Sequence, residues 1–339
     1  MNKAITIYDI ADLLGLSPAT VSRALKNDPR VNSRTIKKVA EAADAMGYQG
    51  NPFARSLRSN KTHIIGVILP RLASHFMSSA ISGIEKIANQ HGYNIIITQS
   101  DELHSKEIIN VKTMFQNRVD GLIVSLCFNS PDVNHFKNFF DKDIPVIFFD
   151  RVPDSYEYPA ITIDNVSASF KATEHLILQG CQYLVHMTAN TNFHIYKERY
   201  EGFKQAMLKY GKKVTDRNLL FNTLDHQSGL NAAEQIIAMK KRPDGIVAAN
   251  DNGAVACMIA LKSAGIRIPE DIAFVGFNND PVAEIVEPKL STVSYSGYDI
   301  GLIAAQNLIQ QLLYPDTKKT LRIIIRSELI IRRSSIRSI

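Results

Sequence analysis

The feature that most limits what this chain can fold into is a regular alternation of short apolar runs with amphipathic stretches, which starts at His63. Continuous apolar runs of this length are typical of parallel strands buried on both faces, and amphipathic stretches such as Met77 to Gln90 predict the helices that cover them. The alternation therefore predicts an α/β fold with a doubly wound parallel sheet. Its first four runs are HIIGVIL (63–69), YNIIITQ (93–99), DGLIVSL (120–126) and IPVIFFD (144–150).

The same rhythm restarts after AITIDN (160–165). The segments RVDGLIVSL (118–126) and RPDGIVAAN (242–250) also resemble one another, and each is followed by a further strand pattern, DIPVIFFD and DIAFVGFN. Because a supersecondary pattern is repeated, we expect two similar doubly wound lobes rather than one large sheet. The runs of the second half are YLVHMTA (183–189), NLLFN (218–222), DGIVAAN (244–250) and IAFVGFN (272–278).

Polar side chains recur where the predicted strands end. Ligands of such sheets bind beyond the carboxyl ends of the strands, so a cleft between two lobes would be lined by both sets. A single polar residue after a strand is more often a turn former, but the recurrence favours a polar or polyhydroxylated small molecule. Arg151 and Arg199 offer planar forks of donors to it. The residues at strand ends are Gln99, Ser100, Ser125, Asp150, Arg151, Asn250, Asp251 and Asn278.

The first sixty residues have the pattern of a small helical head. Thr6 can cap a first helix that Gly15 ends, and Ser17 can cap a second helix with Pro18 at its first position. Two helices joined by so tight a turn predict a helix-turn-helix. A third helix, from Ser33 to Met46, is expected to be capped by Ser33. The core of the head is expected to contain Ile7, Ile10, Ala11, Leu14, Val21, Leu25, Ile36, Val39, Ala40 and Ala43.

Positive charge is concentrated in this head. Residues 1–60 hold nine Lys or Arg and five acidic residues, which gives +4 of the +6 carried by the whole chain. The second helix should present Pro18, Ala19, Thr20, Ser22 and Arg23 to solvent. Short side chains let a helix enter the major groove of DNA, and Arg23 can pair with a guanine edge. A solvated helical hairpin is the alternative that these residues alone leave open.

Composition argues against several other classes of protein. No run approaches the roughly 18 consecutive apolar residues of a membrane span, and Asp9 and Asp12 interrupt the region where a signal peptide needs an apolar core. We therefore expect a cytoplasmic protein. Cys127, Cys181 and Cys257 lie far apart in apolar stretches without CxxC spacing, which predicts buried thiols, with no metal site and no cofactor.

The chain resembles the LacI/GalR family of bacterial transcriptional regulators in two nearly adjoining segments, TIYDIADLLGLSPATVSRALKNDPRVNSRTIKKVAEAADAMGY and NPFARSLRSNKTHIIGVILP. The resemblance lies in the spacing of the helix-turn-helix, the VSRAL run, the Gly-Tyr pair after the third helix and the ARSL segment. It continues to RSELIIRRSS and so covers nearly the whole chain. It implies a DNA-binding repressor whose periplasmic-binding-protein-like (type I) domain binds a small-molecule effector.

The resemblance also implies a division into domains and a set of DNA contacts. We expect a DNA-binding domain at 1–49, a hinge at 50–61 and an effector-binding and dimerisation domain at 62–339. The N-lobe is expected at about 62–161 and 293–321, and the C-lobe at about 162–292 and 322–339. The DNA-binding residues expected are Thr6, Tyr8, Ser17, Pro18, Ala19, Thr20, Ser22, Arg23, Asn32, Arg55 and Leu57.

The hinge is NPFARSLRSNK, Asn51 to Lys61. Its helical stretch is shorter than the roughly 12 residues that an isolated helix needs, so it should fold only on DNA. It resembles the family's hinge helix, which lies in the minor groove and wedges a leucine, here Leu57, into a base step. Arg55 would reach phosphates.

The effector site implied by the resemblance draws on both lobes. Two positions depart from the family pattern: Asn278 stands where a sugar-binding aspartate is usual, and Leu224 stands where several members stack an aromatic ring. A neutral amide donates as well as accepts, so an anionic or modified effector is an alternative to a plain hexose. The effector-binding residues expected are Phe76, Met77, Ser125, Asp150, Arg151, Arg199, Leu224, Asn250, Asp251 and Asn278.

Two other functions use similar folds. A transported-solute receptor is disfavoured by the basic head, and a nucleotide enzyme is disfavoured because no GxGxxG follows the first strand and no GxxxxGK occurs. We therefore expect no enzyme. The family implies a homodimer on a pseudo-palindromic operator in double-stranded DNA. No heptad tail follows IRRSS, which favours a dimer over a tetramer. Induction and corepression both stay open.

Overall fold

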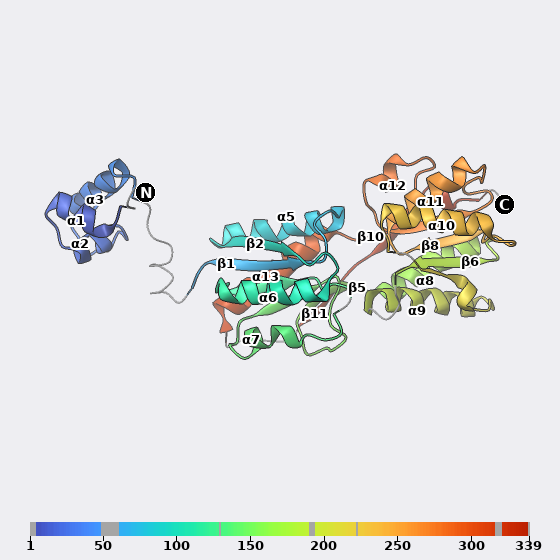
Figure 1. Ribbon diagram of the computed structural model, residues 1–339, viewed down its shortest axis with the longest axis horizontal. Helices are drawn as coiled ribbons and strands as arrows, with labels where there is room; N and C mark the ends of the chain where they lie inside the picture. The colour runs from blue at the N-terminus through green and yellow to red at the C-terminus, as the bar shows by residue number, and fades with distance from the viewer. Residues whose placement is uncertain are drawn as a thin grey trace. The chain divides into compact units, whose positions relative to one another are not determined.

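A computed structural model describes residues 5–48, 61–128, 130–189, 194–221, 223–315 and 321–337 (Figure 1). Its contacts divide the chain into two compact units, residues 1–62 and residues 63–339. The head and the larger unit are therefore treated separately below.

The head is a bundle of three helices, as the sequence predicts. Gly15 ends the first helix in the left-handed conformation, with φ of 62°, which a residue without a Cβ adopts at little cost. The hydroxyl of Ser17 then caps the second helix by accepting from the backbone N–H of Thr20 at 3.1 Å. The helices are α1 (Ile7–Leu14), α2 (Pro18–Ala24) and α3 (Ser33–Ala45).

Two details of the third helix differ from the sequence prediction. Its N-cap is Asn32, whose side chain accepts from the backbone N–H of Arg34, so Ser33 is already the first helical residue. Ala40 is exposed, whereas Ala42 is buried beside Val39 in the core of the head. A turn of 3.6 residues carries Ala40 out of the face that Val39 and Ala42 share.

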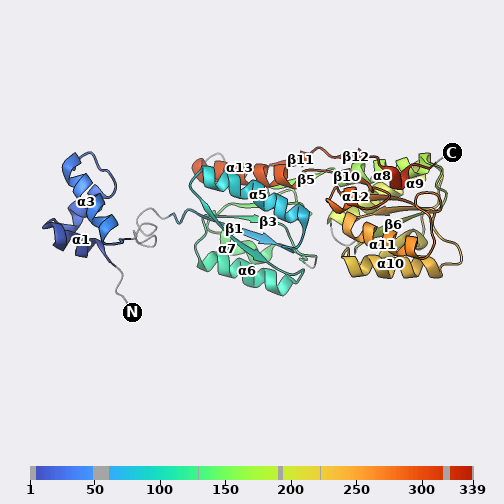
Figure 2. The same cartoon turned by 90° about the horizontal axis from the view of Figure 1, so that it is seen from above.

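The first lobe of the larger unit is built on a parallel sheet in the order β11-β5-β4-β3-β1-β2. Helices cover both faces of it, as Figure 2 shows for α5 and α13 on one side and α6 on the other. The strands are β1 (Ile64–Leu69), β2 (Asn94–Gln99), β3 (Gly121–Val124), β4 (Val146–Phe149), β5 (Ala160–Ile163) and β11 (Arg322–Ile325). The helices are α5 (His75–Gln90), α6 (His104–Gln116), η1 (Asn134–Phe136), α7 (Lys137–Phe140) and α13 (Gly297–Leu313).

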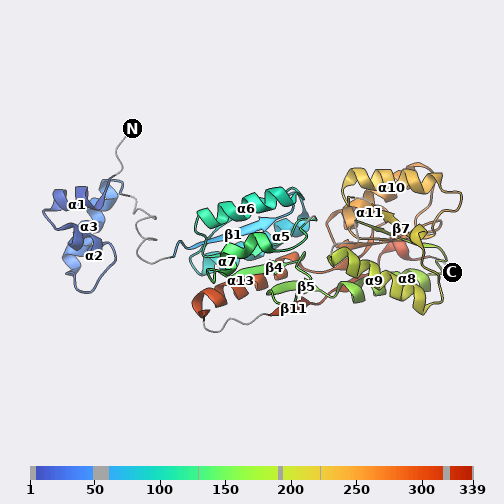
Figure 3. The same ribbon diagram turned by 60° about the horizontal axis from the view of Figure 1, so that its bottom comes forward.

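The second lobe repeats this architecture in the order β12-β10-β9-β8-β6-β7, and only β12 runs antiparallel to its neighbour. Figure 3 shows α10 and α11 on one face of this sheet and α8 and α9 on the other. The strands are β6 (Leu184–Thr188), β7 (Leu219–Phe221), β8 (Gly245–Ala248), β9 (Ala273–Asn278), β10 (Ser291–Ser294) and β12 (Glu328–Ile330). The helices are α8 (Asn165–Leu178), α9 (His194–Lys209), η2 (Asp216–Asn218), α10 (His226–Ala238), α11 (Asp251–Ser263), α12 (Val282–Ile285) and η4 (Arg333–Ser335).

The described chain crosses between the lobes three times, after β5, after β10 and after β11. These crossings differ from the lobe bounds expected from the sequence. Residue 162, the expected start of the C-lobe, lies inside β5 of the first sheet, and residue 293 lies inside β10 of the second. The run 322–325 forms β11, which pairs with β5 in the first sheet rather than joining the C-lobe. Strand pairing of this kind depends on distant partners that a local apolar pattern does not reveal.

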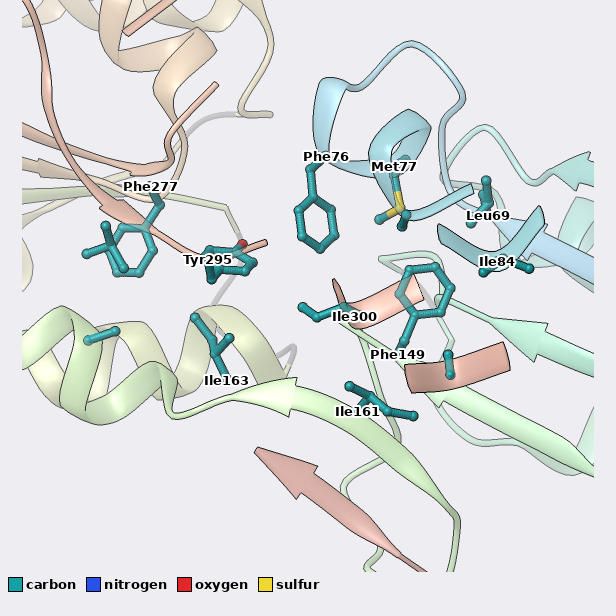
Figure 4. Close-up of a cluster of buried hydrophobic side chains, with 14 of the residues drawn as sticks. Leu69, Phe76, Met77, Ile84, Phe149, Ile161, Ile163, Phe277, Tyr295 and Ile300 are labelled. Carbon is teal, nitrogen blue, oxygen red and sulfur yellow. The ribbon is translucent and has the colours of Figure 1, made fainter. Parts of the chain in front are cut away.

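Both faces of the first sheet are buried. Ile65, Val67 and Leu69 face α5 and α13, whereas Ile68 packs with Phe136 on the opposite face. The first of these clusters continues past the lobe boundary. Figure 4 shows Phe76 of α5 beside Tyr295, with Phe277 beyond Tyr295 and with Met77 on the other side of Phe76. One apolar core therefore ties the two lobes together.

The three cysteines are buried, as expected. No helix of the described chain is long and apolar enough to cross a membrane.

Candidate functional site

A cavity of about 430 Å³ lies between the lobes, beyond the carboxyl ends of several strands of both sheets. Eight of the ten effector-binding residues predicted from the sequence line it: Phe76, Met77, Asp150, Arg151, Arg199, Leu224, Asn250 and Asn278. The lining also includes side chains that the sequence did not single out, chiefly Arg71, Glu102, Phe128, Tyr196, Asp280 and Tyr295.

Arg199 on α9 lines the cavity and is held by three hydrogen bonds. It is 2% exposed, and it donates from Nε to Asn165 Oδ1 at 3.0 Å and from Nη1 to the carbonyl of Ala249 at 2.7 Å. Its Nη2 donates to the hydroxyl of Tyr295 at 3.0 Å, and its guanidinium lies 4.2 Å from the ring centroid of Phe277. These contacts hold a buried charge in one orientation, with an edge turned to the cavity.

Asn278, at the end of β9, is held by its neighbours on both sides. Its Oδ1 accepts from the hydroxyl of Tyr295 at 2.8 Å, and its Nδ2 donates to Asp280 Oδ2 at 3.4 Å. Asp280 is 3% exposed, and its Oδ1 has no hydrogen-bond partner among the described residues. A carboxylate thus stands two residues after position 278 and holds the Asn278 amide, while its second oxygen is buried.

Arg151 is paired within the first lobe. Its Nη1 donates to both carboxylate oxygens of Glu102, at 2.9 and 2.7 Å, and its guanidinium lies 4.1 Å from the ring centroid of Phe128. Its Nη2 donates to the hydroxyl of Tyr196 at 3.4 Å, which reaches α9 of the second lobe. The positive charge of Arg151 is therefore largely neutralised before any ligand arrives.

Asp150 follows β4 with φ of 57°, a conformation that a non-glycine residue adopts only when its surroundings hold it there. Burial raises the pKa of its carboxyl, although Arg151 and Arg199 act in the opposite direction. An aspartate in this setting can accept from a ligand hydroxyl or, when protonated, donate to it.

Apolar side chains form the remaining walls. Phe76 and Met77 stand in the first turn of α5, and the Phe76 ring lies 5.2 Å from that of Tyr295. Leu224 packs with Tyr196 and Ile195 on the second-lobe side. Apolar walls next to a few directed polar groups are typical of small-molecule binding sites.

Two predicted residues do not line the cavity. Asp251 is fully buried beneath it, where its carboxylate accepts from the Thr292 hydroxyl and from the backbone N–H of Asp280, both at 2.8 Å. Ser125 is fully buried at the end of β3. Asn250, which does line the cavity, also caps α11 by accepting from the backbone N–H of Gly253. Its neighbour Asp251 points inward because it is the first residue of that helix.

Only some of the cavity residues that the sequence analysis missed could have been found from a pattern in the sequence. Tyr196 lies three positions before Arg199 on the same helix, so it shares the cavity-facing side, and helical spacing could have found it. Glu102 lies in the loop after β2 and Tyr295 lies on a crossing between lobes. No local pattern marks these two, since only the tertiary fold brings them to the cavity.

The head presents a second candidate surface. The predicted DNA-binding residues of the described head are all exposed or half-buried: Thr6, Tyr8, Ser17, Pro18, Ala19, Thr20, Ser22, Arg23 and Asn32. Ser17 and Thr20 hydrogen-bond to each other through their hydroxyls at 2.9 Å, which orders the first turn of α2. Arg55 and Leu57, predicted for the hinge, lie outside the described residues.

A helix-turn-helix head followed by a two-lobed domain with a polar cavity defines a DNA-binding regulator controlled by a ligand. Comparison with known proteins supports this class. The chain belongs to the LacI family of bacterial regulators: the family profile "Bacterial regulatory proteins, lacI family" matches residues 6–51, and "Periplasmic binding proteins and sugar binding domain of LacI family" matches residues 62–333.

Relatives match over nearly their whole length. Catabolite control protein A of Priestia megaterium is 32% identical over 90% of this chain and 91% of its own. HTH-type transcriptional regulator RegA of Clostridium saccharobutylicum is 32% identical over 98% and 100%. A solved Lac repressor dimer, bound to operator and the anti-inducer ONPF, has a TM-score of 0.85 at 22% identity, covering 99% of this chain and 100% of that one, which is a likeness of fold. The protein is thus a transcriptional regulator and not an enzyme, as its sequence predicts.

Proposed function

We propose that this regulator represses transcription from a specific operator, to which it binds through α2, and that a small molecule in the interlobe cavity controls the binding. The observation that carries the proposal is the composition of the cavity wall. Both lobes contribute to it, and so does Tyr295, which stands where the chain passes from one lobe to the other. A ligand in this cavity would contact both lobes and the segment that joins them. These are the parts that must move relative to one another when the regulator changes its affinity for the operator.

The lining favours a polyhydroxylated effector, a sugar or a sugar derivative. The charged lining residues are Arg71, Arg151, Arg199, Glu102, Asp150, Asp225 and Asp280. Acids therefore outnumber arginines, and the two arginines nearest the centre already donate to protein acceptors. Asp280 adds a carboxylate to the cavity wall, and its buried Oδ1 has no hydrogen-bond partner among the described residues. Hydroxyl donors satisfy such acceptors. Arg151 is paired with Glu102, whereas Arg199 donates to neutral acceptors, so an anionic sugar derivative that meets Arg199 stays an alternative to a neutral sugar.

On the DNA side, α2 would enter the major groove. Ala19 and Thr20 on its first turn are small enough for close approach, and Arg23 is exposed for contact with a guanine edge. Thr6, Tyr8, Ser17, Pro18, Ser22 and Asn32 would contact the backbone or the groove walls. The net charge of the head gives this binding a dependence on salt.

We further propose that the regulator acts as a homodimer on a pseudo-palindromic operator. The support is the Lac repressor of similar fold, which was solved as a dimer on its operator. Two heads related by a two-fold axis would then read two half-sites. The hinge, with Arg55 and Leu57, would fold between them in the minor groove, a prediction that comes from the sequence alone.

The experiment starts by selecting an operator from random DNA with the full-length protein. Operator affinity is then measured with and without each member of a panel of sugars and sugar acids, chosen by thermal shift. We expect at least one neutral sugar to raise the melting temperature and to change operator affinity. Deletion of residues 1–60 should abolish DNA binding and spare the thermal shift.

The site variant for this experiment is Asp280→Asn, which replaces a carboxylate in the cavity wall by a neutral amide. It should weaken sugar binding while operator affinity in the absence of sugar stays as in the wild type. A sugar that binds in the cavity without changing operator affinity would refute control through this site, and the absence of a thermal shift with every sugar and sugar acid of the panel would refute the effector class.

A further inference from the structure

A second polar cluster lies away from the effector cavity, in the first lobe. His104 and Glu107 stand three residues apart in the first two turns of α6, and His135 reaches them from η1. One atom from each side chain, an imidazole nitrogen or a carboxylate oxygen, lies within 4.8 Å of the other two. Nothing in the operator or effector binding proposed above uses these three side chains.

The distances within the cluster suit a single small cation. His135 Nε2 lies 3.0 Å from Glu107 Oε1, and His104 Nδ1 lies 3.8 Å from the same oxygen. Two ligands of a tetrahedral zinc ion, each about 2.1 Å from the metal, stand about 3.4 Å apart. Shifts of a few tenths of an ångström would therefore bring both pairs to coordinating separation.

Glu107 is suited to bridge a metal and the protein because its two oxygens have separate tasks. Oε2 accepts from the backbone N–H of Cys127 at 2.8 Å, whereas Oε1 faces the two histidines. The side chain is fully buried, which fixes its position. The hydroxyl of Ser130 donates to Oε1 and lies 3.2 Å from His104 Nδ1, so it contacts two of the three side chains of the cluster.

The histidines also have the right accessibility. The side chain of His135 is 6% exposed, and its Nδ1 has no hydrogen-bond partner in the described part of the chain. The polar contact of this ring is therefore made by Nε2, with Glu107. The side chain of His104 is 27% exposed, which leaves a path for an ion to enter.

We propose that His104, Glu107 and His135 bind a divalent transition-metal ion, with Zn²⁺ the best match. Two imidazoles and one carboxylate are a ligand set that zinc and ferrous iron share, whereas calcium and magnesium require mainly oxygen ligands. The fourth position falls to the Ser130 hydroxyl or to water. The other reading of the cluster is a hydrogen-bonded network that only holds the loop after β3.

The site connects to the effector cavity through one peptide unit. Cys127 N–H is held by Glu107, and the next N–H, that of Phe128, donates to Glu102 Oε2 at 3.1 Å. Glu102 and Phe128 both line the cavity and both contact Arg151. A metal ion on Glu107 would stiffen this loop and with it one wall of the effector site.

The test is calorimetric titration of the full-length, tag-free, chelator-treated protein with Zn²⁺. We expect one ion per chain in the wild type and binding at least tenfold weaker in His104→Ala and in His135→Ala. The matched control is His91→Ala, which removes an exposed histidine whose Nδ1 is hydrogen-bonded to the carbonyl of Ile87. It should bind zinc as the wild type does.

Cobalt gives an independent readout, because a four-coordinate Co²⁺ site absorbs visible light far more strongly than the hydrated ion. We expect these bands in the wild type and not in either site variant. If His135→Ala does not fold, the partly exposed His104→Ala remains decisive. The proposal is overturned if the wild type binds no zinc at micromolar concentrations, or if wild type, site variants and control bind it equally.

Discussion

Arg199 on α9 donates a hydrogen bond to the hydroxyl of Tyr295 at 3.0 Å, and that hydroxyl donates in turn to Asn278 Oδ1 at 2.8 Å. Tyr295 follows β10, where the chain leaves the second lobe for the first. Its ring packs against Phe76 of the first lobe. The side chain of Tyr295 therefore contacts Arg199, Asn278 at the end of β9, and Phe76 of the first lobe.

We predict that Tyr295→Phe lowers the free energy of unfolding by about 1–3 kcal/mol, because the buried Arg199 would keep a donor without its partner and the half-buried Asn278 would lose the donor to its Oδ1. Urea denaturation of the full chain measures this. Tyr298→Phe is the matched control, since it removes a hydroxyl from a half-buried ring that lies near Lys86 and should cost much less. Equal losses in the two variants would contradict a special role for the Tyr295 hydroxyl.

A pH dependence follows from His186 in β6. Burial lowers the pKa of this histidine to about 3, and its Nδ1 contacts the carbonyl of Val247 at 3.0 Å. The unfolded chain binds a proton near pH 6.5 and the folded chain does not, so this group makes stability fall as pH drops from about 6.5 toward 3. The loss from this residue between pH 7 and pH 5 should be about 2 kcal/mol.

The comparison that isolates this effect is His186→Asn, in which an amide can still donate to Val247 but does not titrate. Its unfolding free energy should change less with pH than that of the wild type across the same range. Identical pH slopes would exclude His186 as the source, whatever the stability of the variant at pH 7.

In the head, Gly15→Ala should cost about 1 kcal/mol because alanine resists the left-handed conformation at φ of 62°. An added Cβ would meet no atom within 4 Å, so the cost is conformational and not steric. Gly15→Asn should cost less, since asparagine tolerates this region better. Hydrogen exchange of head amides in the full chain reports both, and equal effects of the two substitutions would contradict the explanation.

For operator recognition, Arg23→Ala should reduce the preference for the selected operator over random DNA by about 10- to 100-fold, the value of one bidentate arginine contact. Arg30→Ala is the control. Arg30 is already paired with Asp28, with Nη2 and Oδ2 2.7 Å apart, so its loss should leave selectivity nearly unchanged. Competition binding assays at fixed salt measure the selectivity of both variants. Equal losses of selectivity would mean that the positive charge of the head, and not a contact of Arg23 with a base, determines operator preference.

For the hinge, Leu57→Ala should weaken operator binding and leave effector affinity unchanged, because the expected wedge contacts only DNA. Fluorescence anisotropy with operator DNA and calorimetry with the effector provide the two readouts. Unchanged operator affinity would refute the wedge.

Much of the fold could be predicted from the sequence because its signals are local. Apolar runs marked the strands of both sheets except β5, β10, β11 and β12, and Gly15 and Ser17 marked the turn of the head. Ala40 and Ser33 were misassigned because one step along a helix changes which face or cap position a residue occupies. The pairing of β11 with β5 was not foreseeable, since both are short apolar runs that would fit either sheet.

For the candidate site, residues directly after strands were placed well, because parallel strands deliver their carboxyl ends to one edge. Asp251 shows the limit of that rule, since a helix starts there and turns its side chain inward. Tyr295 and Glu102 could not be found from spacing. Their roles come from contacts with residues more than 40 positions away, Arg199 and Arg151.

The three crossings between the lobes also limit how the larger unit can move. β11 lies next to β5 in the first sheet, and β12 lies next to β10 in the second, so the crossings enter and leave along neighbouring strands. A single tether would let one lobe swivel freely about the other. Three connecting segments side by side resist rotation of one lobe about the long axis of the unit. Bending of the two lobes toward each other across these segments is then the motion that meets the least resistance. A ligand that draws the lobes together would thus bend these three connecting segments about one common axis rather than twist them.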